Sequence, residues 1–284
     1  MIKNIVPYRR IFNYKCLGDD YDTIYLDTSS IFSDRFIKTI YKKQFRKGFI
    51  KSEYNVLSYL RTTSDFSLAA PNSLRNEWNN TSNGLIRWVG RNGGSFINKE
   101  LKLSDKLFFC ASTPRFLRSK VVPSSNYHNS KLYSELSDLV RFMGHLSARV
   151  KSKDLESPSY TDEDVFTDAI WRYIHTNENI GIISLDGDFV SLYRNLVRTM
   201  GFRDFMPKNT DFKSRLRNQR LDLFYGSFSD FELRYTSDQF SQIYKFTPFV
   251  KNLNPGDVAE HKVELFTRIK DFWTHYYDSK IIDI

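Results

Sequence analysis

Apolar residues along the chain alternate between patterns typical of buried strands and patterns typical of amphipathic helices. Three short apolar runs, at residues 23–26, 66–70 and 180–185, predict strands, and each is followed by apolar residues at helical spacing. Helices are expected over residues 30–47, 54–61, 132–150, 189–200 and 257–277, in the segment after Pro71 and in the segment from Thr161, with a last strand over 202–206. This alternation predicts an α/β fold with three α/β/α layers and a central, mostly parallel sheet.

Two segments depart from this pattern. Between about residues 81 and 130 the pattern weakens, because Gly90, Gly93 and Gly94 punctuate a basic loop and residues 106–110 form an additional candidate strand. We interpret this segment as an insertion. From about residue 218 the sequence pattern changes to an alternation rich in Tyr and Phe. The expected organisation is therefore a domain over 1–217 and a C-terminal extension over 218–284.

Composition favours a globular protein with an acidic partner. Hydrophobic residues make up 40% of the chain, which is enough for a packed core, and the net charge of +9 favours nucleic acid or an anionic membrane surface. No apolar stretch approaches the roughly 18 residues of a membrane helix, so we expect no membrane partner. Cys16 and Cys110 lack the spacing of a zinc site or a disulfide framework, which favours a reducing compartment and a cytoplasmic location.

Acidic residues follow the predicted strands and supply the candidate chemistry. Asp27 and Asp186 each lie at the carboxyl end of an apolar strand, where open α/β sheets bind ligands, and Asp188 is two residues further on. Glu77 and Asp164 lie near the starts of neighbouring helices. Two carboxylates about 4 Å apart repel by about 4 kcal/mol at an effective dielectric of about 20, so such a cluster needs cations. Oxygen ligands favour Mg²⁺ or Mn²⁺, and two such ions would activate water against a phosphodiester.

Each of these acids also has a purely structural interpretation. Asp27 could cap the following helix, Asp186 and Asp188 could form a turn around Gly187, and Glu77 could be a solvated helix residue. For the third acid the sequence leaves two positions open. Thr161 and Asp164 fit a capping box that needs no metal, and Asp168 lies one turn further along the same helix face.

The motifs around these acids resemble the PIN domain, a family of metal-dependent nucleases. The resemblance rests on residues 24–29 (Ile-Tyr-Leu-Asp-Thr-Ser), on residues 70–73 (Ala-Pro-Asn-Ser) through Glu77, and on residues 184–189 (Ser-Leu-Asp-Gly-Asp-Phe). It covers residue 24 to about residue 207 and leaves the insertion unmatched. It implies an endoribonuclease that uses Mg²⁺ or Mn²⁺ to cut mostly single-stranded RNA.

Other activities are weighed against this resemblance. A haloacid dehalogenase phosphatase would carry Asp at the position of Ser29, and no P-loop motif is present. A PIN-like module that binds RNA or protein without cutting and a flap-type DNA nuclease remain alternatives, and a toxin role has no support. RNA is expected to contact two basic stretches, for which solvated surface is the alternative. Their residues are Lys38, Lys42 and Arg46 in the first, and Lys208, Lys213, Arg215 and Arg217 in the second.

Overall fold

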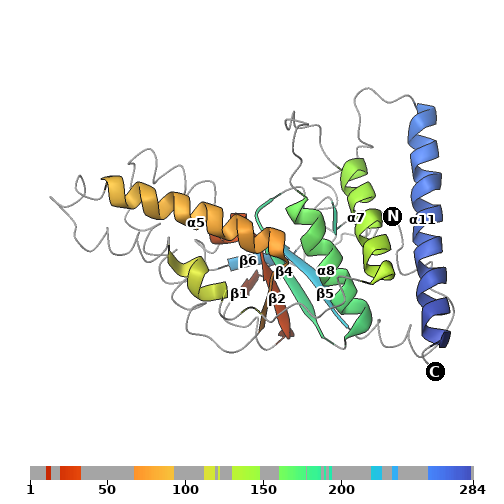
Figure 1. The fold of residues 1–284 in the computed structure, drawn as a ribbon, viewed down its shortest axis with the longest axis horizontal. Coiled ribbons are helices and arrows are strands. Elements are labelled where there is room, and N and C mark those ends of the chain that lie inside the picture. The colour runs from red at the N-terminus through yellow and green to blue at the C-terminus, as the bar shows by residue number, and fades with distance from the viewer. Residues whose placement is uncertain are drawn as a thin grey trace, which may run out of the picture. The chain divides into compact units, whose positions relative to one another are not determined.

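The computed structural model shows an α/β fold (Figure 1). It describes residues 11–13, 20–32, 67–92, 112–118, 121, 130–147, 160–176, 178–186, 189, 192–193, 219–225, 232–235 and 255–282. The chain divides into two compact units. The first comprises Met1–Pro123, Asn179–Leu185 and Asp222–Tyr235, and the second comprises Ser124–Glu178, Asp186–Leu221 and Thr236–Ile284.

The first unit contains a mixed sheet. Its described strands are β1 (Ile11–Asn13), β2 (Thr23–Leu26), β3 (Ser67–Ala69), β4 (Ile180–Ser184), β5 (Leu221–Tyr225) and β6 (Glu232–Tyr235). Their order in the sheet is β1-β6-β5-β4-β2-β3. Strand β2 lies between β3 and β4 and is parallel to both, whereas β6 is antiparallel to β1 and to β5. The expected parallel arrangement is therefore confirmed around β2.

The two central parallel strands explain why the sequence pattern marks them. Every residue of β2 and of β4 is buried, as expected for strands that are covered on both faces. Gly181 in β4 permits a close approach, because a Cβ atom there would lie 2.8 Å from Cδ1 of Ile24. The bounds predicted for these strands agree with the structure to within one residue.

Two helices of the first unit differ from the sequence expectation. Helix α2 (Thr28–Ile31) ends at Phe32, whose backbone is not helical, so the continuous helix predicted from residue 30 is wrong at this point. Helix α5 (Asn72–Asn92) begins directly after Pro71 as expected, but it continues through Gly90, so the basic loop predicted there is also wrong. Its buried residues recur every three or four positions: Leu74, Trp78, Ser82, Leu85 and Val89.

The second unit is built on three packed helices, α7 (Lys131–Ser147), α8 (Thr161–His175) and α11 (Pro255–Ile282). Helix α7 packs against both α8 and α11, and Figure 1 shows it between them. The three helices lie where the sequence predicted helices, although α11 is longer than expected at both ends. Aromatic side chains join them, since the Tyr133 and Trp171 ring centres are 5.5 Å apart and those of His175 and Tyr276 are 5.2 Å apart.

Strands β5 and β6 come from the segment that the sequence assigned to a C-terminal extension, yet they belong to the same sheet as β2. The predicted strands at 106–110 and 202–206 and the predicted helix at 54–61 lie outside the described residues, as do Gly93 and Gly94. No described helix has both the length and the apolar character needed to cross a membrane.

Candidate functional site

Asp27 lies at the carboxyl end of β2, beside the end of β4. Its backbone N–H donates to the carbonyl oxygen of Ile183 at 3.0 Å, which continues the β2–β4 pairing by one residue. The residue is only 4% exposed. A carboxylate this deeply buried requires polar partners, because loss of its hydration is costly.

Two serine hydroxyl groups supply such partners. Ser184, the last residue of β4, donates from Oγ to Oδ2 of Asp27 at 2.8 Å, and Ser29 donates from Oγ to the same oxygen. The hydroxyl of Ser29 also accepts a hydrogen bond from the backbone N–H of Leu185 at 2.9 Å. These contacts fix the Asp27 carboxylate between the chain segments that leave β2 and β4.

The helix-capping interpretation of Asp27 is not the observed arrangement. Asp27 occupies the N-cap position of α2, but its side chain makes no capping hydrogen bond. Its backbone carbonyl instead accepts the hydroxyl of Ser30 at 2.6 Å. The partners of the carboxylate include the hydroxyl groups of Ser29 and Ser184 instead.

Helix α5 is anchored at the same end of β2. The indole Nε1 of Trp78 donates to the carbonyl oxygen of Leu26 at 3.0 Å, and Trp78 is completely buried. The preceding residue, Glu77, is half-buried. Glu77 therefore precedes a residue that is fixed to Leu26, the last residue of β2.

Asp164 and Asp168 lie one turn apart on α8 and have different surroundings. Oδ1 of Asp164 accepts from Nη2 of Arg141 at 3.2 Å, and its side chain is 26% exposed. The N-cap residue of α8 is Tyr160, which makes no side-chain capping hydrogen bond, so the predicted capping box of Thr161 and Asp164 does not form. Asp168 is almost completely buried and pairs with Arg172, with 3.6 Å between Oδ2 and Nε.

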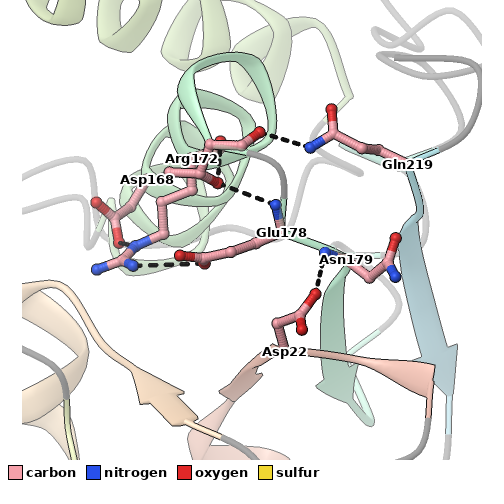
Figure 2. Close-up of polar contacts among 7 residues, drawn as sticks. Asp22, Asp168, Arg172, Glu178, Asn179 and Gln219 are labelled. Carbon is pink, nitrogen blue, oxygen red and sulfur yellow. Dashed lines mark hydrogen bonds and ion pairs between the residues drawn. The ribbon is translucent and has the colours of Figure 1, made fainter. Parts of the chain in front are cut away.

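Figure 2 shows how Asp168 is held within the second unit. The guanidinium group of Arg172 lies between two carboxylates, that of Asp168 and that of Glu178, which is 3.7 Å away. Beyond the helix, Nε2 of Gln219 donates to the backbone carbonyl of Thr176. Asp168 is therefore paired with a residue one turn further along α8, and that residue also contacts Glu178 beyond the end of the helix.

A separate carboxylate flanks the opposite end of β2 in the first unit. Oδ2 of Asp22 accepts from the backbone N–H of Asn179 at 2.8 Å, as Figure 2 also shows. Asp22 and Asp27 thus bracket one strand, each held by the chain segment that borders β4.

The predicted site residues fall partly in the first unit, partly in the second and partly outside the described residues. Asp27 and Glu77 belong to the first unit, and Asp164, Asp168 and Asp186 belong to the second. Asp188 lies outside the described residues. Within the described ranges, no three His, Cys, Asp or Glu side chains gather closely enough to hold a metal ion. The predicted RNA contacts also lie outside the described residues: Lys38, Lys42, Arg46, Lys208, Lys213, Arg215 and Arg217.

Sequence reasoning gave Ser29 and Ser184 no role at this site. The available signal was a serine two positions from an acid near the end of each of two buried strands, Ser29 after Asp27 and Ser184 before Asp186. Comparison of the chain with protein-family models, with curated proteins and with solved structures gave no match.

Proposed function

We propose that the chain is a divalent-metal-dependent endoribonuclease that hydrolyses phosphodiester bonds in single-stranded RNA, on a PIN-like fold of three α/β/α layers. The observation that supports this proposal best is the arrangement around Asp27. A buried carboxylate stands at the carboxyl end of a parallel strand pair, with two hydroxyl groups holding one of its oxygens. Open α/β sheets bind their ligands at this end of their strands.

The donor atoms of the proposed site fit a hard divalent cation. Asp27, Glu77, Asp164, Asp186 and Asp188 would supply only carboxylate oxygens, the ligands that Mg²⁺ and Mn²⁺ prefer. Asp186 follows Ser184 by two residues, and the chain limits the distance between their Cα atoms to about 7 Å. A bound metal would supply an activated water and stabilise the leaving oxygen of the phosphodiester.

Within α8, the surroundings of the two candidate acids favour Asp164 as the third ligand. Asp168 is committed to a buried ion pair with Arg172, and removal of one partner from such a pair is costly. Asp164 is partly exposed and makes a single contact with Arg141. The carboxylate of Asp164 is therefore the more accessible of the two.

The structure provides a matched pair of variants for testing the role of Asp27. The full-length chain would be incubated with labelled single-stranded RNA, single-stranded DNA and flap DNA, with Mn²⁺, Mg²⁺ or a chelator. We expect Asp27→Asn to reduce RNA cutting more than about 100-fold, because even outer-shell partners of a metal contribute 10- to 100-fold. Asp22→Asn, at the other end of the same strand, is expected to cut at the parent rate.

Three results would contradict the proposal in different ways. RNA binding without cutting in any metal would indicate a non-catalytic module. Cutting of flap DNA but not RNA would indicate the related DNA nuclease. Equal activity of the Asp27→Asn and Asp22→Asn variants would remove Asp27 from the catalytic residues.

A further inference from the structure

One face of α5 carries a row of amide and guanidinium side chains. Its residues recur every three or four positions, so they lie on the side of the helix opposite the buried residues, and most of them are exposed. We call this row the Asn–Arg face, and its residues are Asn76, Asn80, Asn83, Arg87 and Arg91. The helix contains a single carboxylate, that of Glu77 near its start.

A third arginine joins this face from a neighbouring segment of the first unit. Residues 112–117 form a short helix, drawn in yellow next to α5 in Figure 1. Nη2 of Arg115 in this helix donates to Oδ1 of Asn83, and Arg115 is exposed. Three guanidinium groups, those of Arg87, Arg91 and Arg115, therefore lie on one surface of the first unit.

The positive charge of this surface is not neutralised by neighbouring carboxylates in the described part of the chain. The arginines of α7, α8 and α11 each pair with a carboxylate. In contrast, Arg87, Arg91 and Arg115 form no ion pair with any described residue. Like charges four positions apart on a helix repel each other, as Arg87 and Arg91 do. The surface is therefore complementary to a partner that carries several negative charges.

Helix α5 leads from the strand end at Asp27 to these arginines. Trp78 fixes the start of the helix to Leu26, the residue before Asp27. At 1.5 Å per residue, Arg87 lies about 14 Å and Arg91 about 20 Å further along the helix axis than Trp78. A single strand of several nucleotides that has one phosphate at Asp27 can therefore follow the helix to both arginines.

We infer that the Asn–Arg face of α5, together with Arg115, binds the phosphate backbone of single-stranded RNA on one side of the cleavage site. The inference rests on the proposed function, which supplies RNA as the polyanion. Guanidinium groups form strong paired hydrogen bonds with phosphate, and Asn amides donate to phosphate and sugar oxygens. Such contacts hold the strand irrespective of its base sequence.

The test measures binding of a fluorescent oligouridine RNA to the full-length protein by fluorescence anisotropy, with EDTA present so that binding is measured without cutting. The double variant Arg87→Gln with Arg91→Gln is expected to raise the Kd about 2- to 30-fold, the range for loss of two exposed ion pairs. The slope of log Kd against log salt concentration is expected to fall by about 1.4, since each phosphate contact on a single strand contributes about 0.7.

The double variant Arg268→Gln with Lys270→Gln on α11 is the matched control for net charge. Both residues are exposed and belong to the second unit, so the control removes the same charge away from the Asn–Arg face. It is expected to keep the Kd and the salt slope of the parent protein. Poly-glutamate, a polyanion without phosphate, is expected to bind the parent protein more weakly than the RNA does.

Failure of this inference and failure of the proposed function give different results. If the two double variants bind RNA equally well, or if poly-glutamate binds as tightly as RNA, the inference is overturned even where the parent protein cuts RNA. If only the Arg87 and Arg91 variant loses affinity and the parent protein cuts RNA with no metal, the Asn–Arg face is supported and the proposed catalytic function is overturned.

Discussion

Replacement of Asp168 by Asn should destabilise the second unit, whereas the same replacement at Asp164 should have little effect. Both residues lie on α8 one turn apart, and each pairs with an Arg. The pairs differ in burial. The side chains of Asp168 and Arg172 are 2% and 8% exposed, so their charges are shielded far less by water than those of Asp164 and Arg141.

The expected loss of stability can be estimated from the distance between the charges and from their burial. Two unit charges 3.6 Å apart attract by about 5 kcal/mol at an effective dielectric of about 20. Loss of one partner of a buried pair costs about 3 to 5 kcal/mol, because the other charge remains buried. Arg172 keeps its contact with Glu178, so we expect the lower end, about 3 kcal/mol, for Asp168→Asn. For Asp164→Asn we expect less than about 1 kcal/mol.

Differential scanning calorimetry would measure these effects, since it can resolve separate transitions for the two units. A loss of about 3 kcal/mol corresponds to a fall in Tm of about 6 to 12 °C in a cooperative unit of this size. The double variant Asp168→Leu with Arg172→Met removes both charges and should recover most of the loss. Equal falls in Tm for Asp164→Asn and Asp168→Asn would refute the argument from burial.

Three further predictions concern the first unit and the basic segment. Ser184→Ala removes a hydrogen-bond donor to a buried carboxylate, so urea unfolding should show a free energy of unfolding lower by about 1.5 to 3 kcal/mol. Equilibrium dialysis should show about 10- to 100-fold weaker Mn²⁺ binding. Unchanged Mn²⁺ affinity would argue against a link between this hydroxyl and the metal. Gly181→Ala should lower the free energy of unfolding by about 1 to 3 kcal/mol, because the added Cβ overpacks the core. Gly84→Ala in α5 should raise it by up to about 1 kcal/mol, because a Cβ there meets nothing within 4 Å. Similar effects at both positions would contradict the packing argument. Replacement of the three basic residues in 213–217 by Ser should weaken RNA binding and lower its salt slope by about 0.7 per lost phosphate contact, and an unchanged slope would assign this segment to solvated surface.

The parts of the fold that the sequence predicts well are those in which local pattern and burial coincide. Strands β2 and β4 are buried throughout and mostly apolar, so a short run of β-forming residues marks each of them. Asp27 could be identified for the same reason. The polarity of the sequence changes abruptly where an acid directly follows a wholly buried strand.

Helix α5 shows where local pattern misleads. Its exposed face is rich in Asn and contains Gly84 and Gly90, which are poor helix formers, so its second half resembles a loop. The spacing of Trp78, Leu85 and Val89 was nevertheless helical and could have identified it. Burial of this face outweighs the weak propensity of the exposed residues.

Pairing between distant segments could not be predicted from one sequence. Strand β1 is three residues long and pairs with β6. Neither local sequence indicates which strand it will pair with. The contact between Asp27 and Ser184 also depends on pairing between distant segments. Ser184 reaches the carboxylate only because β4 is the neighbour of β2, which is a property of the sheet and not of the local sequence.

The separation of Asp27 and Ser184 has a consequence for the protein during its synthesis. The two residues are 157 positions apart, so the hydroxyl of Ser184 does not exist until long after Asp27 has been made. At about 5 to 20 residues per second, this interval lasts about 8 to 30 seconds. Throughout that time the ribosome carries a growing chain in which the Asp27 carboxylate lacks its β4 partner. The hydrogen bond between Ser184 and Asp27 can therefore form only after most of the chain has been translated.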